Sequence, residues 1–268
     1  MSVTGHPMPP GEFADVLRRI EETMRRAEDE MRRLVDNVQD ALDWVGPFAS
    51  GVRDVLAKMW ELFRRFNEEL WKFFAQPGVP WTLWSHGNDW SGEPIGGRVS
   101  QLVAKATLDE IRVDDVWQGP AAEAYRNTLS RQKDALATLK ASADLIDDVL
   151  TKVAIAIGGL WLTLLAGILS FALELIAEAG AAATVVGAPA AAGGGLASVV
   201  KVLAWVSGTA AAFYAFFGND ALMGAKDLHQ QLHNSSAYPD GHWPRSTADM
   251  SDGSLSDGDG TDWRLKYA

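Results

Sequence analysis

Two long apolar segments constrain this chain more than any other feature of its sequence. The first runs from Val153 to Leu173 and contains 21 uncharged, mostly apolar residues. As a helix it would be roughly 31 Å long, close to the roughly 30 Å of a bilayer core. The second runs from Leu196 to Gly218 and carries Lys201 as its only charge. Each segment needs either lipid or a large protein surface to cover it.

The residues between and around these segments favour a helical hairpin over residues 153–218. Glu174 and Glu178 end the first segment, and Pro189 with the glycines at 193–195 predicts a bend before the second. The hairpin is expected either to insert in a membrane or to be buried in a soluble bundle. Basic residues flank its outer ends: Arg131, Lys133, Lys140, Lys152 and Lys226. For a resident membrane protein, this distribution predicts that both termini lie in the cytoplasm.

Residues 1–75 predict amphipathic helices. Apolar residues recur at alternating steps of four and three from Phe13 to Val45, which is a heptad pattern. Opposite charges four residues apart predict ion pairs on the solvent face: Glu21–Arg25, Glu22–Arg26, Glu28–Arg32 and Asp29–Arg33. A Gly-Pro pair at 46–47 ends or kinks this helix, and a broad aromatic face follows over 48–74. That face is expected to pack against more than one neighbour, or to remain partly exposed for association.

Residues 76–94 predict a loop, because they are rich in Gly, Pro and Trp and show neither helical nor strand periodicity. Trp81, Trp84 and Trp90 are expected to fold back onto the aromatic helix, since each has a large apolar area to bury. Stacking against a sugar or another ligand is the alternative for these tryptophans.

A second helical hairpin is expected over residues 95–152. Apolar residues with heptad spacing lie on both sides of the corner in VWQGPAAEAYRNTL. Gly119 supplies the backbone freedom of a tight corner, Pro120 suits the first turn of the next helix, and Trp117 caps the hairpin core. No glycine or proline separates the heptad pattern of the second helix from Val153, so that helix is expected to continue into the first apolar segment.

This corner resembles the turn of the WxG helical-hairpin proteins that type VII secretion systems export. Trp117 and Gly119 stand on the motif positions, and AAEAY matches the small-small-x-small-aromatic start of the family's second helix. The resemblance covers roughly residues 95–150. It implies a secretion substrate that associates with itself or with a protein partner through helical faces.

The Tyr-x-x-x-acid export signal of that family has no counterpart in this sequence. The residues four positions after Tyr125, Tyr214 and Tyr238 are not acidic. The N-terminal residues also lack the basic and apolar regions of a secretory signal peptide. The chain is therefore expected either to leave by a non-classical route with a smaller hairpin partner that carries the signal, or to stay with the cell that made it.

Composition and motifs narrow the function classes further. A net charge of −11 argues against nucleic-acid binding, because phosphate recognition needs a basic face. Cysteine is absent, which excludes disulfides and thiolate chemistry. His229 and His233 lie one helical turn apart without a third ligand, so we expect a surface helix end and no metal site. We find no catalytic set and no cofactor motif, and therefore expect neither an enzyme nor a cofactor.

Together these patterns predict an all-α protein, an elongated bundle of coiled-coil hairpins with a hydrophobic hairpin of transmembrane length. Residues 219–268 are expected to form an acidic, largely disordered tail. The leading hypothesis is a non-enzymatic type VII-like secretion substrate, an oligomer that inserts residues 153–218 into membrane lipid as a pore-forming or membrane-active element. The alternative is a resident membrane-anchored scaffold whose cytoplasmic coiled-coil helices recruit a partner.

Overall fold

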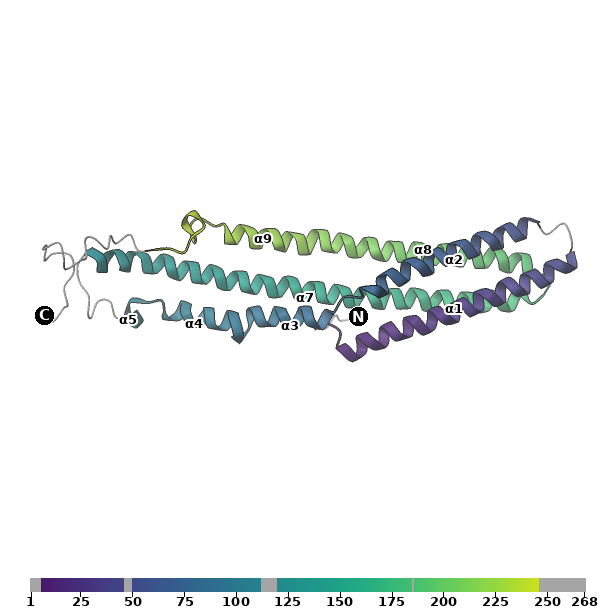
Figure 1. Ribbon diagram of the computed structural model, residues 1–268, viewed down its shortest axis with the longest axis horizontal. Helices are drawn as coiled ribbons and strands as arrows, with labels where there is room; N and C mark the ends of the chain where they lie inside the picture. The colour runs from purple at the N-terminus through teal and green to yellow at the C-terminus, as the bar shows by residue number, and fades with distance from the viewer. Residues whose placement is uncertain (1–5, 46–49, 112–119, 185, 246–268) are drawn as a thin grey trace. The chain divides into compact units, whose positions relative to one another are not determined.

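The computed structural model describes most of the chain, and every regular element that it describes is helical (Figure 1). The described residues are 6–45, 50–111, 120–184 and 186–245. The prediction of an all-α protein is confirmed. The described residues divide between two compact units, one within the ranges 1–81 and 153–217 and the other within the ranges 82–152 and 218–268.

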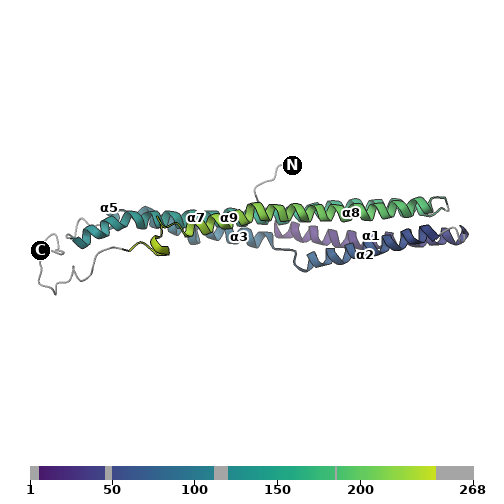
Figure 2. The ribbon, with the colours of Figure 1, turned by 90° about the horizontal axis from the view of Figure 1, so that it is seen from above.

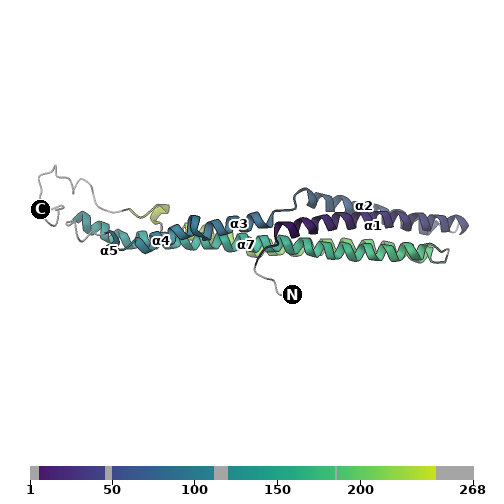
Figure 3. The same ribbon diagram turned by 90° about the horizontal axis from the view of Figure 1, so that it is seen from below.

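The first unit consists of two layers of helices. Helices α1 (Pro10–Val45) and α2 (Ser50–Ala75) form one layer. The C-terminal part of α7 (Pro120–Ala182) and helix α8 (Ala188–Phe216) form the other. Figures 2 and 3 show from opposite sides that the α1–α2 pair lies along one face of the α7–α8 hairpin.

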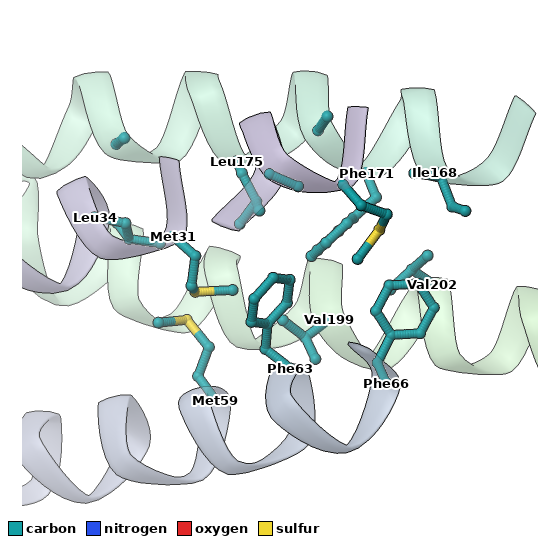
Figure 4. Close-up of a cluster of buried hydrophobic side chains, with 14 of the residues drawn as sticks. Met31, Leu34, Met59, Phe63, Phe66, Ile168, Phe171, Leu175, Val199 and Val202 are labelled. Atoms are coloured by element: carbon teal, nitrogen blue, oxygen red, sulfur yellow. The ribbon is translucent and has the colours of Figure 1, made fainter. Parts of the chain in front are cut away.

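The core of this unit lies between the two layers, as Figure 4 shows. Its labelled side chains are Met31 and Leu34 of α1, Met59, Phe63 and Phe66 of α2, Ile168, Phe171 and Leu175 of α7, and Val199 and Val202 of α8. Phe171 contacts Phe63 and Phe66, with 6.0 Å between ring centroids in each pair. Trp161 is also buried, and its indole NH donates to the carbonyl of Pro77 over 2.8 Å. The aromatic face of α2 therefore packs against more than one neighbour, as predicted.

The heptad prediction for α1 is confirmed. Its seam is buried from Phe13 to Ala41, apart from Leu17, which is partly buried. Ion pairs within one turn lie on its outer face: Glu21–Arg25, Glu28–Arg32, Arg18–Glu22 and Glu30–Arg33. The first two were predicted. Glu22 and Arg33 have partners other than the predicted ones, because a second opposite charge lies within one turn of each.

The predicted loop over residues 76–94 is wrong for most of its length, because Pro80–Ser91 form helix α3. The helix begins with a proline, whose fixed φ suits the first turn. Gly87 permits close packing on α7, since a Cβ there would come within 3.3 Å of the Asp147 backbone. The turn is confined to the residues before the helix, where Gly78 has a φ of +76°.

The tryptophans of this segment do not share one environment. Trp81 packs on the core of the first unit, edge-on to Phe13 of α1 with 5.6 Å between ring centroids. Trp90 is exposed at the end of α3. The prediction that the three tryptophans fold back onto the aromatic helix is wrong for Trp90, and the ring contact of Trp81 is with α1.

The first arm of the predicted 95–152 hairpin is not one helix. It contains the π-helical turn η2 (Glu93–Gly97), α4 (Arg98–Lys105) and α5 (Leu108–Ile111). The break lies at Ala106, whose ψ of 63° is not helical. The second arm belongs to α7, which runs into the first apolar segment without interruption, as predicted.

Residues 219–245 are largely helical, so the predicted disordered tail is wrong for this part. The π-helical turn η3 (Phe217–Ala221) leads into helix α9 (Leu222–Leu232), and a 3-10 turn, η4 (Pro239–Gly241), follows. Gly224 allows α9 to approach α7, since a Cβ there would meet the Val149 side chain. The hydroxyl of Tyr238 donates to the carbonyl of Ala135 over 2.9 Å. The rest of the predicted tail, 246–268, lies outside the described residues.

The two arms of the apolar hairpin meet between Ala182 and Ala188, earlier than predicted. Pro189 and the glycines at 193–195 lie inside α8 instead of forming the bend. The proline is in the first turn, where its missing NH leaves no hydrogen bond unmade. Gly195 permits close helix packing, because it fits against α1 and α2.

Candidate functional site

The α7–α8 hairpin of the first unit is apolar on two opposite faces. Its inner face, which includes Ile168 and Phe171, is buried against α1 and α2. Its outer face exposes large apolar side chains, among them Leu162, Ile176 and Leu173, the last of which is 67% exposed. The exposed face of an amphipathic helix would be polar. We call the exposed apolar residues of this hairpin its outer face.

Burial also ends part-way along α8. In the first half of the helix, Val199 and Val202 are buried in the core. From Leu203 to Phe216 no side chain is fully buried, and Trp205 and Tyr214 are 49% and 67% exposed. The second half of α8 therefore adds to the outer face.

Both helices are long and apolar enough to cross a membrane. The most apolar 18-residue window of α7 has a mean hydropathy of 2.1, and 33% of it is buried. For α8 together with its extension into α9, these values are 1.6 and 17%. The core helix of a soluble protein would be mostly buried, so the hairpin is less covered than such a helix.

A groove of about 500 Å³ runs along the second half of α8. Its lining residues are mainly small or apolar: Ala156, Gly159, Leu160, Thr163, Ala204, Trp205, Gly208, Thr209, Ala212, Phe213 and Phe216. The Trp205 indole NH donates to the carbonyl of Thr163 over 3.2 Å. Gly167 leaves room for the Trp205 ring, which would collide with a Cβ at that position. The groove suits an apolar occupant.

A charged cluster interrupts the apolar hairpin. Lys201 of α8 donates to Glu174 of α7, and the hydroxyl of Ser170 donates to the same carboxylate over 3.4 Å. The Lys201 side chain is exposed, whereas that of Glu174 is partly covered. Because the ion pair joins the two arms, it defines their register. This pair could not be predicted from the sequence, because a bend at 189–195 would place Lys201 opposite another part of α7.

Most of the predicted turn motif cannot be placed in this structure. Trp117 and Gly119 lie outside the described residues, and Pro120 is the first residue of α7. The ends of the predicted membrane segments differ in cover: Val153 and Leu196 are half-buried, whereas Leu173 and Gly218 are exposed.

The two histidines with metal-ligand spacing stack on each other at the end of α9. The rings of His229 and His233 have 4.0 Å between centroids, and Nδ1 of His233 lies 2.8 Å from the carbonyl oxygen of His229. The predicted helix end is confirmed, since α9 ends at Leu232. Among the described residues, no group of three His, Asp or Glu side chains is arranged to hold a metal ion. The absence of enzymatic activity remains a prediction.

Comparison with known proteins finds no match to this chain. No family model matches the chain, and neither a curated protein nor a solved structure matches it significantly.

Proposed function

We propose that this chain is a non-enzymatic protein that inserts its α7–α8 hairpin into a membrane. The observation that carries the proposal is the incomplete cover of two helices of membrane-spanning length, which have α1 and α2 along one face only. Moving the outer face from water into lipid is favourable by roughly 25 cal/mol per Å² of apolar surface. A bilayer therefore supplies the cover that the chain itself does not.

Helices α1 and α2 act in this proposal as a soluble cover for the inner face. Their outer faces carry exposed ion pairs such as Glu28–Arg32 and Arg64–Glu68, which favour water. Trp60 and Trp71 are exposed on α2 and offer a surface for association with another helix. A cover of this kind keeps the hairpin in solution until a membrane competes for it.

We further propose that the chain is a type VII-like secretion substrate that assembles through its helical faces. The support is the WxG resemblance over residues 95–150, together with the long helix that begins at Pro120 directly after the motif. Because the acidic residue of the export signal is missing, a smaller hairpin partner that carries the signal is part of this proposal.

The alternative is a resident membrane-anchored scaffold. The same outer face supports it, and the basic residues that flank the hairpin favour cytoplasmic termini. In this case α1 and α2 recruit a partner from the cytoplasm and the chain is not exported.

Fractionation of the producing cell tests both forms of the proposal. A tagged full-length protein is followed in cytosol, carbonate-washed membranes and culture medium, with and without a functional type VII system. Recovery in the medium that depends on this system supports the secretion substrate, and exclusive retention in washed membranes supports the scaffold. Purely cytosolic protein that also fails to float with liposomes contradicts both. A clear hydrolytic activity of the purified protein would contradict its non-enzymatic character.

A further inference from the structure

Each arm of the apolar hairpin contains an uncharged stretch of at least 18 residues. On α7 this stretch comprises residues 153–173, and on α8 with η3 it comprises residues 202–219. At 1.5 Å per helical residue, the stretches are roughly 31 Å and 27 Å long. Both lengths are close to the roughly 30 Å of a bilayer core.

The charges at the bend side of these stretches are paired across the hairpin. Lys201 donates to Glu174, so the two uncharged stretches end at the same level. Glu178 lies one turn nearer the bend, where Gly194 leaves room for its carboxylate. The apolar zone therefore has a common charged boundary on this side.

Charges also meet at the other end of the stretches. Lys152, which precedes the first stretch, pairs with Asp148 over 2.7 Å. The hydrogen bond that Lys152 donates to Asp148 is the main cause of the raised pKa of Lys152, and the charge of Asp220, which follows the second stretch, contributes in the same direction. Each stretch is therefore bounded by a charged residue at this end as well, Lys152 on α7 and Asp220 after α8.

We propose that residues 153–173 and 202–219 cross the bilayer core side by side, and that the Glu174–Lys201 pair lies at the interface nearer the bend. The parts of the hairpin on the bend side of this pair, residues 175–184 and 186–200, then emerge on the far side. This inference rests on the proposed membrane insertion and adds the depth and orientation of the inserted hairpin.

The aromatic residues of α8 agree with these boundaries. Trp205 lies four residues from Lys201, and Tyr214 lies six residues from Asp220. Both side chains belong to the outer face. Tryptophan and tyrosine gather at both membrane interfaces, because their rings are apolar and their NH or OH groups are polar.

Matched lysine substitutions test the boundaries. Ala166 and Ala177 are both exposed on α7, and only Ala166 lies inside the proposed zone. Ala211 and Ala197 form the equivalent pair on α8, with Ala211 inside. All four Ala→Lys changes affect exposed positions, so the soluble fold is expected to persist and is checked by circular dichroism.

The four variants are compared by flotation with phosphatidylcholine vesicles, whose zero net charge avoids attraction of the added lysine. We expect Ala166→Lys and Ala211→Lys to lower vesicle binding by on the order of a hundredfold, because lysine is costly in a bilayer core. Ala177→Lys and Ala197→Lys are expected to bind like the wild type.

A single thiol tests the crossing itself. The chain contains no cysteine, so Val186→Cys, between the two arms, provides a unique label. After insertion, we expect this thiol to be protected from a membrane-impermeant maleimide until detergent is added.

Labelling of Val186→Cys from outside intact vesicles would overturn the crossing, because the hairpin then lies in the interface. Equal binding by all four lysine variants would overturn the boundaries while leaving membrane binding in place. A wild-type protein that does not float with vesicles would overturn the proposed function and this inference together.

Discussion

Helices α1 and α8 pack against each other, but the side chains that they expose to water differ in polarity. The buried seam of α1, with Met31 and Leu34, lies opposite a face of ion pairs. In α8 the buried Val202 is followed within one turn by Trp205, which is exposed. One layer of neighbours therefore covers the apolar surface of α1 but not that of α8. The difference teaches that α8 has apolar surface that the described helices leave uncovered, and lipid is the cover that we propose for it.

The largest effect on stability should come from the inner face of the hairpin. We expect Phe171→Ala to lower the free energy of unfolding by about 3–5 kcal/mol, because it removes a buried ring that contacts Phe63 and Phe66. Leu173→Ala, on the outer face, should change it by less than about 0.5 kcal/mol. Urea unfolding followed by circular dichroism measures both, and equal losses would contradict the distinction between the two faces.

Substitutions at two glycines of α8 should change stability in opposite directions, because Gly195 packs closely against α1 and α2 whereas Gly193 faces open space. A Cβ at Gly195 would lie 2.6 Å from Cδ2 of Leu34 and 2.8 Å from Sδ of Met59. We expect Gly195→Val to destabilise the fold by about 1–3 kcal/mol through overpacking. Gly193, two residues earlier, has open space, so Gly193→Ala should stabilise the helix by roughly 0.5–1 kcal/mol. Thermal melting of both variants checks the opposite signs; a stabilising Gly195→Val would disprove the close approach.

A disulfide between the hairpin and the residues just before α1 should hinder membrane insertion of the hairpin. The Cβ of Met8 lies 3.5 Å from the position of a Cβ at Gly158, within the range of about 3.5–4.5 Å for a disulfide. We expect oxidised Met8→Cys/Gly158→Cys to bind vesicles at least tenfold more weakly, a change of about 1.4 kcal/mol.

Reduction should restore the binding of this double variant, and each single cysteine variant serves as a control. If the oxidised and reduced forms float equally well, the hairpin engages membranes without release of this N-terminal segment. The difference in cover between α1 and α8 would then describe the soluble protein but would not explain how the protein binds a membrane.

The smallest effect should come from the charged face of α1. Arg25→Ala removes the exposed pair with Glu21 and should cost about 0.2–0.5 kcal/mol at low salt. Screening should reduce this loss at high salt. Melting curves at two salt concentrations measure it, and a large, salt-independent loss would mean that Arg25 has a packing role.

Sequence reasoning succeeded where the signal was local. The heptad spacing located α1, and the Gly-Pro pair at 46–47 located its end. Sequence-based prediction failed where glycine and proline are compatible both with a bend or loop and with a helix. Pro189 and Gly195 suggested a bend, and Gly87 suggested a loop, yet all three lie in helices.

The misplaced bend also concealed part of the candidate site. Lys201 was visible as the only charge of the second apolar segment, but its partner depends on which residues of the two arms lie opposite each other. Only a bend between Ala182 and Ala188 brings it to Glu174. The boundary proposed for the membrane zone therefore required the structure.

The sequence by itself determined the all-α class, the α1 seam and the two apolar segments, because periodicity and composition act over a few helical turns. The tertiary structure decided which face of each apolar segment is covered and which charges pair across the hairpin. These depend on contacts between residues far apart in the chain, such as Phe63 with Phe171, and no local pattern specifies such contacts.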